Sequence, residues 1–422
     1  MTRISRLAPL ALAAFLGACD NESLIPPTFP GLADPLFVRY VAFGNSITAG
    51  FQSGGINDSL QTRSYAALLA GQMGTEFNIP LLNRPGCPPP LTNIFAQTLL
   101  GPPLLTGCAF RNPAVPEHLN LVAVPGAAVL DAYNPLGSGN KSNTLTTIIG
   151  GGRSQVANAA EVMPTFVTAW VGNNDALGAI LDDANPGNPA LVTAPAEFAA
   201  RYAAFMDSLD AYGTIEGGVL IGAVQVGLAP YLSQGRAWKQ FELGFDAQSA
   251  PLNFFDVTAA CLAGQEIPGT TDTAWTSVPF AKGAPILAEA NAKVDSVQGG
   301  LLAPGNVVPA TIDCAVDTDV ITVNEMLNLF SSVAQYNAAI AAEAQARDWI
   351  FIDPNALLTQ LAGTPGAILP FPTFTDQASP APFGSALSLD GIHPSTSTHV
   401  LVANALIQAI NAKYGTGVPV VN

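Results

Sequence analysis

The feature that most constrains the fold is an alternation of short apolar runs with segments whose apolar residues recur at helical spacing. Strands without polar alternation, such as the run at 218–226, are typical of the interior of a parallel sheet. The connections are too short to form separate domains, so we expect an α/β fold, a three-layer α/β/α sandwich around a mostly parallel sheet. The pattern predicts strands at 36–43, 120–124, 165–171, 218–226 and 349–353, and helices at 64–73, 154–163, 196–212, 323–347 and 397–413.

Composition places the chain among globular proteins and argues against a nucleic-acid partner. Of the 422 residues, 49% are hydrophobic and only 11% are charged, which is enough apolar surface for a substantial core. The formal net charge is −16, and the 15 Lys and Arg residues are scattered along the chain. Binding to phosphates needs a cluster of positive charge, so we expect no nucleic-acid partner.

The N-terminus has the pattern of an export signal. Arg3 and Arg6 precede an apolar run at 7–18, which is too short to span a bilayer but suits a secretory signal. The run ends in Leu-Gly-Ala-Cys, which resembles the lipobox of bacterial lipoproteins and implies lipidation at Cys19; a cleaved signal with a chance cysteine is the alternative. We expect a signal and lipobox at 1–19, a tether at 20–35, and a protein exported to the bacterial cell envelope and attached to a membrane by its lipid.

The cysteine count fits this interpretation. Five cysteines leave one unpaired in an exported chain, and Cys19 accounts for it. The remaining four allow three pairings. We favour Cys87 with Cys108 and Cys261 with Cys314, because each pair lies within one Pro- and Gly-rich segment.

Polar residues follow several of the predicted strands. Ser46 comes directly after the first strand, Gly126 follows the second, and Asn174 follows the third. In a parallel sheet the carboxyl ends of the strands meet at one edge, where ligands bind. Asp390 and His393 lie in the last loop before the final helix. These five residues are therefore expected at one site.

Their chemistry matches nucleophilic catalysis. A serine hydroxyl needs a base to take its proton, and the base needs a group that orients it. The chain has three histidines; His118 lies in a loop and His399 within the last helix, whereas His393 has an acid three residues before it. Backbone N–H groups near Gly126 and the Asn174 amide can donate hydrogen bonds to an oxyanion.

These residues together carry a family resemblance. It rests on Gly44-Asn45-Ser46-Ile47, Gly126, Gly172-Asn173-Asn174-Asp175 and Asp390-Gly391-Ile392-His393-Pro394, which resemble the four blocks of the SGNH/GDSL hydrolases in the same order. The resemblance implies a flavodoxin-like sandwich with Ser46 as nucleophile, His393 as base and Asp390 as its orienting group. It also implies an oxyanion hole formed by the Ser46 and Gly126 amides and the Asn174 side chain. Asn45 stands where the family usually has Asp, and we expect activity to survive this change, although turnover could be reduced.

The hydrolase domain is expected to span 36–413, with a C-terminal tail at 414–422. Within it, the segment 227–319 interrupts the alternation with aromatic, Pro and Gly residues, and we interpret it as an irregular insertion. The run at 137–142 resembles a phosphate-binding loop only weakly, because Asn140 precedes the lysine. No Cys or His spacing matches a zinc site, so neither a metal nor a cofactor is expected.

The sequence therefore predicts an exported serine esterase or lipase that cleaves carboxylic esters through an acyl-enzyme. The aromatic insertion could form an apolar acyl pocket or lid, which favours hydrophobic esters, or it could be a packed structural subdomain. An esterase that removes O-acetyl groups from polysaccharide is an alternative, in which aromatic residues would stack on sugars. A non-catalytic surface binding protein on the same fold is a third hypothesis, motivated by Asn45.

Overall fold

The computed structural model describes residues 34–101, 111–112, 118–369, 371–372, 374 and 376–422. Cys19, Cys108 and most of the predicted tether lie outside these residues. The lipid anchor and the Cys87–Cys108 pairing therefore stay predictions. Within the described part of the chain, no helix combines the length and apolar character needed to cross a bilayer.

A parallel sheet forms the centre of the molecule. Its order is β1-β4-β5-β12, with parallel pairing at each step. The segment at 120–124 extends the sheet beside β1, through a parallel bridge between Ala42 and Leu121. The strands are β1 (Tyr40–Gly44), β4 (Phe166–Trp170), β5 (Gly217–Ile221) and β12 (Ile350–Ile352).

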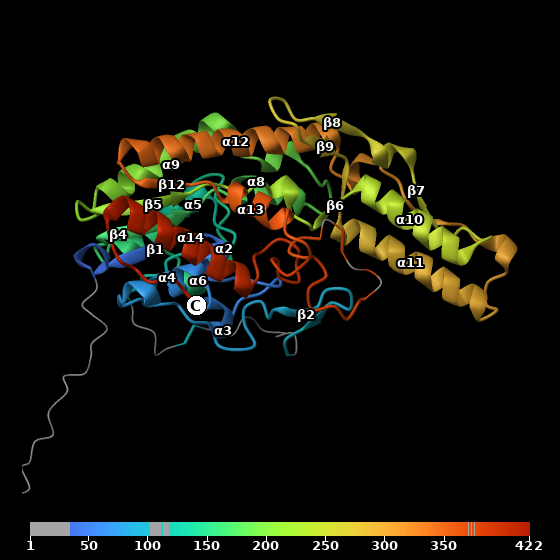
Figure 1. The fold of residues 1–422 in the computed structure, drawn as a ribbon, viewed down its shortest axis with the longest axis horizontal. Helices are drawn as coiled ribbons and strands as arrows, with labels where there is room; N and C mark the ends of the chain where they lie inside the picture. Colours follow the sequence, from blue (N-terminus) through green and yellow to red (C-terminus); the bar gives the residue numbers. More distant parts are fainter. Residues whose placement is uncertain (1–33, 102–110, 113–117, 370, 373, 375) are drawn as a thin grey trace, which may run out of the picture.

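Successive side chains of the strands point to opposite faces of the sheet, and helices cover both faces. On one face Val41 and Phe43 pack into a core with helices α5, α8, α9 and α12. On the other, Tyr40 and Ala42 pack against α4 and α14. Figure 1 shows these two helical layers on either side of the strands, so the expected three-layer α/β/α sandwich is confirmed. The helices are α2 (Ser46–Ala49), α3 (Asp58–Gln61), α4 (Tyr65–Met73), α5 (Val129–Tyr133), α6 (Thr144–Gly150), α7 (Gln155–Ala159), α8 (Asn174–Ile180), α9 (Pro195–Asp210), α12 (Val323–Ala346), α13 (Pro354–Ala362) and α14 (Thr396–Tyr414).

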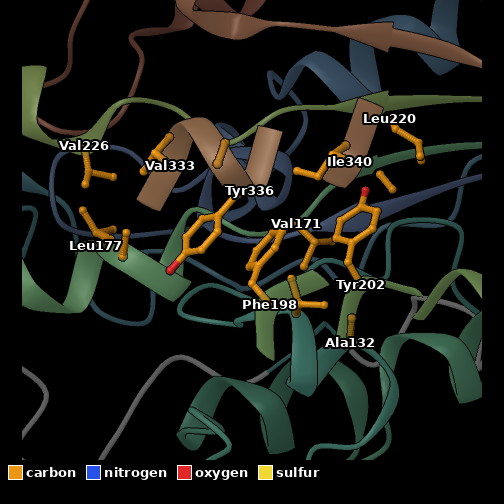
Figure 2. Close-up of a cluster of buried hydrophobic side chains, with 14 of the residues drawn as sticks. Ala132, Val171, Leu177, Phe198, Tyr202, Leu220, Val226, Val333, Tyr336 and Ile340 are labelled. Carbon is orange, nitrogen blue, oxygen red and sulfur yellow. The ribbon is translucent and has the colours of Figure 1, made fainter. Parts of the chain in front are cut away.

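Aromatic rings fill the larger of these two cores. Phe198 on α9 stacks on Tyr336 of α12 with ring centroids 3.9 Å apart, and Tyr202 lies one helical turn further along α9 (Figure 2). All three are buried. Burying side chains of this size is worth several kcal/mol of transfer free energy, so this layer is a major contributor to stability.

The insertion (residues 227–319) is more regular than the sequence suggests. It contains two long helices, and Figure 1 shows them projecting beside the sandwich. Trp238 on α10 is fully buried against α11, where Gly283 leaves room for the ring: a Cβ there would lie 2.2 Å from it. The elements are α10 (Gly235–Ser249), α11 (Phe280–Gln298), β6 (Leu232–Gln234), β7 (Phe255–Val257), β8 (Gly264–Glu266), β9 (Thr273–Trp275), β10 (Ser277–Pro279) and β11 (Ala310–Ile312), while β2 (Leu91–Asn93) and β3 (Thr98–Leu99) form a small hairpin outside the insertion.

Several predicted boundaries differ from the structure for local reasons. Residues 35–37 form a 3₁₀ turn rather than the start of a strand, because Pro35 fixes its own φ and the Asp34 side chain accepts from the Leu36 N–H. The strand predicted at 218–226 ends at Ile221. Helices α6 and α13 were not predicted: α6 lies in a segment with many Gly, Ser and Asn residues, and α13 spans only nine residues.

Candidate active site

Ser46 lies at the carboxyl end of β1, as the first residue of the short helix α2. Asn45 caps this helix: its Oδ1 accepts a hydrogen bond from the Ile47 N–H at 3.1 Å. Gly44 before it allows the close turn, because a Cβ there would lie 2.0 Å from the Thr48 hydroxyl. An aspartate carboxylate could make the same cap, so Asn45 preserves the local structure of the turn.

The loop before α14 holds Asp390 and His393, the predicted acid and base. Asp390 Oδ1 accepts hydrogen bonds from the backbone N–H groups of Ile392 and His393, at 3.0 and 2.9 Å. Its Oδ2 accepts from the Gly54 N–H at 2.7 Å and from His393 Nδ1 at 2.8 Å. The carboxylate is therefore fixed by two segments of the chain, and it fixes the imidazole in turn.

His393 connects this loop to the serine. Its Nε2 lies 2.9 Å from Ser46 Oγ. A carboxylate can only accept, so Nδ1 carries the ring proton and Nε2 presents its lone pair to the serine hydroxyl. The structure thus brings Ser46, His393 and Asp390 into one hydrogen-bonded chain, and all three residues are buried.

Electrostatics favour the ionised form of Asp390. Burial alone would raise the pKa of this carboxyl, but the charge of an imidazolium at His393 and the hydrogen bonds donated by His393 and Ile392 outweigh it. The result is a pKa lowered to about 2. Asp390 therefore stays negative through the whole range in which His393 would act as a base.

The predicted oxyanion donors come from the two strands beside β1. Gly126 has φ +85°, in the left-handed region, and a Cβ there would lie 2.6 Å from Asn143 Nδ2. Asn174 begins α8 and donates from Nδ2 to the Ala127 carbonyl at 2.9 Å, which ties it to the Gly126 turn. One hydrogen of that amide remains for another acceptor.

Sequence reasoning missed two neighbours of these donors. Asn173 lines the small cavity beside Ser46, and its Oδ1 accepts from the Val224 N–H at 3.0 Å. The signal in the sequence that could have identified Asn173 was its position directly before Asn174. Lys141, from the run that resembles a phosphate-binding loop, donates from Nζ to the Asn174 carbonyl and so supports the first turn of α8.

Two cavities adjoin the triad. One of about 40 Å³ lies against Ser46 and His393 and is lined mainly by apolar residues such as Leu177 and Val226. A larger one, of about 530 Å³, lies beside Asp390 between the insertion and the β2–β3 hairpin. Part of the insertion thus lies near the site, as the hypothesis of an acyl pocket or lid requires.

The other two histidines and the disulfide are not part of this hydrogen-bonded chain. His399 is fully buried on α14, where its Nδ1 accepts from the Tyr65 N–H at 3.2 Å. His118 is partly exposed beside Asn78. Cys261 and Cys314 form the predicted disulfide within the insertion, with Cα atoms 4.9 Å apart. Among the described residues, no group of three or more His, Cys, Asp and Glu side chains is placed to hold a metal ion.

Comparisons with known proteins add little to this geometry. No protein-family model and no curated protein sequence matches the chain. Similar solved structures include an acetylxylan esterase from Geobacillus stearothermophilus, with 12% identity, a TM-score of 0.37 and coverage of 88% of this chain and 93% of that one. An extracellular lipase from Streptomyces rimosus has 14% identity, a TM-score of 0.33 and coverage of 89% and 98%. At these values, function has to be argued from the residues of this chain.

Proposed function

We propose that this protein is a serine ester hydrolase of the SGNH type, which cleaves carboxylic esters through an acyl-enzyme. The observation that carries the proposal is the continuous chain from Asp390 through His393 to Ser46, with contacts of 2.8 and 2.9 Å. A nucleophile, a base with a free lone pair and an orienting carboxylate are the groups that acyl transfer requires.

In this mechanism Ser46 Oγ attacks the ester carbonyl while His393 Nε2 takes its proton. The carbonyl oxygen becomes an oxyanion, which accepts hydrogen bonds from the Ser46 and Gly126 N–H groups and from Asn174. The ester C–O bond then breaks, and His393 returns the proton to the leaving alcohol. Water activated by His393 attacks the acyl-enzyme and releases the carboxylic acid and Ser46.

Asp390 acts through the base in this scheme. It holds the imidazole in the tautomer that leaves Nε2 unprotonated, and its negative charge stabilises the imidazolium formed during attack. Apart from the ester and the water of the second step, every group in this scheme is a residue of this chain.

The test is hydrolysis of p-nitrophenyl acetate and butyrate by the form that starts after Cys19. Ser46→Ala should lower kcat by roughly 10⁴-fold or more, because the acyl-enzyme can no longer form. Ser331→Ala, which removes an exposed hydroxyl on α12, is the matched control and should retain full activity. The wild type should also react with a fluorophosphonate probe, and Ser46→Ala should not.

A folded wild type that neither hydrolyses these esters nor reacts with the probe would contradict the proposal. That result would favour the non-catalytic surface binding protein as the function of this fold.

A further inference from the structure

A second apolar cavity lies under α13, at the edge of the sheet. Its volume is about 110 Å³, and its walls come from the ends of β5 and β12, from α13 and from α14. Three leucines of α13 line it: Leu357, Leu358 and Leu361. All three stay only half-buried, and Pro354 is the one fully buried residue of this helix. The apolar face of α13 is thus incompletely packed by the protein itself.

This cavity shares part of its wall with the small cavity against Ser46. Ile47, Val224 and Ile392 line both it and the small cavity against Ser46. Ile47 directly follows Ser46, and Ile392 directly precedes His393. These three side chains therefore border both spaces, and a chain attached to Ser46 that passes them would reach the space under α13.

The chemistry of the walls selects an aliphatic occupant. Apart from Trp170, the polar side chain on the walls is Thr398, whose hydroxyl already donates to the Ala386 carbonyl at 2.7 Å. No charged side chain lines the cavity. Among the wall side chains, Trp170 Nε1 is a buried donor without a partner. A charged group placed there would lose its water and could gain at most this one side-chain hydrogen bond, whereas methylene groups gain free energy.

The cavity beside Asp390 differs in this respect. It is larger, about 530 Å³, and amide side chains of Gln97, Asn291 and Gln377 take part in its walls. It therefore offers hydrogen bonds as well as aromatic surface. Of the two spaces, the one under α13 is the better match for a hydrocarbon chain.

We propose that the cavity under α13 binds the acyl chain of the ester, and that the enzyme prefers medium-chain acyl groups over acetyl. This inference rests on the proposed function. Apolar cavities on the order of 150 Å³ hold a ligand the size of benzene, so the space under α13 accommodates several methylene groups. The first carbons of the chain occupy the small cavity at Ser46.

The first experiment compares kcat/KM for p-nitrophenyl octanoate and acetate. In the wild type octanoate exceeds acetate, by roughly fourfold for each methylene that enters the cavity. Leu361→Trp fills the space and lowers this ratio by roughly 16- to 64-fold, for two or three excluded methylenes. Leu358→Trp fills the same space from the previous turn and serves if Leu361→Trp fails to fold, as judged by thermal unfolding.

Two matched variants separate this site from other surfaces. Leu401→Trp adds the same ring to an exposed leucine of α14 and leaves the ratio unchanged. Ala284→Trp fills the cavity beside Asp390 and also leaves the ratio unchanged. A ratio that falls in Ala284→Trp but not in the α13 variants would overturn the inference, and so would a wild type that prefers acetate. The latter result would favour the O-acetyl esterase.

A binding measurement keeps this inference separate from the proposed function. Calorimetric titration of the Ser46→Ala protein with sodium decanoate should show binding that Leu361→Trp weakens at least tenfold. Decanoate binding without any ester hydrolysis by the wild type would uphold the cavity assignment and reject the esterase. Hydrolysis of acetate without decanoate binding would do the reverse.

Discussion

The strand-end site and the insertion are held together by different forces. At the site, buried polar groups are fixed by short hydrogen bonds to backbone atoms, such as those that Asp390 accepts from Gly54 and His393. In the insertion, Trp238 and Phe255 belong to an aromatic cluster, and a disulfide closes a loop with a sequence separation of 53. Changes at the site should therefore alter turnover more than stability, and changes in the insertion should do the opposite.

A backbone hydrogen bond joins the two regions. The N–H of Tyr231 donates to the Gly391 carbonyl at 3.0 Å, within the loop that carries His393. If this hydrogen bond positions the loop, changes in the insertion would alter turnover as well as stability. Variants at the site and in the insertion can test whether turnover and stability change independently.

Among the changes that compare these two regions, the largest effect is expected for Asn174→Ala. The loss of one oxyanion donor should lower kcat for p-nitrophenyl acetate by roughly 100- to 1000-fold with little change in KM. Asn173→Ala is the matched control: its Oδ1 accepts from the Val224 N–H, and the change should lower kcat less than tenfold. Steady-state kinetics on both variants would measure this.

If Asn173→Ala lowered kcat more than Asn174→Ala, the oxyanion donor would be Asn173, which lines the cavity at Ser46. Equal and large losses in both variants, together with lower melting temperatures, would mean that the start of α8 had moved.

A smaller effect, on stability, is expected when the disulfide is removed. The Cys261→Ala, Cys314→Ala double variant should lose roughly 2–4 kcal/mol of unfolding free energy, because the open loop gains entropy in the unfolded state. Turnover of acetate at 25 °C should stay within twofold of the wild type. Urea unfolding followed by tryptophan fluorescence, with kinetics on the same preparation, would measure both.

A tenfold loss of turnover in this double variant, without unfolding, would contradict the separation of the two regions. It would show that the insertion positions the His393 loop through the contact between Tyr231 and Gly391.

Much of the site could be predicted because its determinants are local. Ser46, Asn174 and His393 each lie just after a strand or just before a helix, and the parallel arrangement of the sheet brings such ends to one edge. Asp390 is three residues from His393, so a single turn joins the acid to the base. For these residues, the pattern along the chain already contains most of the geometry.

The insertion and α13 could not be predicted in the same way, because their structure depends on distant contacts. Phe374 and Phe383 pack into the aromatic cluster of the insertion from a loop that follows it in the chain. Helix α13 is short, and its three leucines lie half-buried along a cavity. Where tertiary contacts decide the structure, periodicity alone is a weak guide.

The smallest effect concerns pH and contrasts two histidines of the same region. His393 has the carboxylate of Asp390 beside it, whereas His399 is fully buried with its Nδ1 bonded to the Tyr65 N–H. Burial, and secondarily the positive charge of His393, lowers the pKa of His399 to about 3. In the unfolded chain the pKa of a histidine is about 6.5, so between these values only the unfolded state binds this proton. Unfolding therefore becomes easier as pH falls, by roughly 2 kcal/mol between pH 7 and pH 5.

His399→Gln can keep an acceptor for Tyr65 but cannot titrate, so its unfolding free energy should fall less over this range. Urea unfolding of both proteins at several pH values would measure the difference, and parallel pH profiles would show that His399 is solvated and protonated in the folded state.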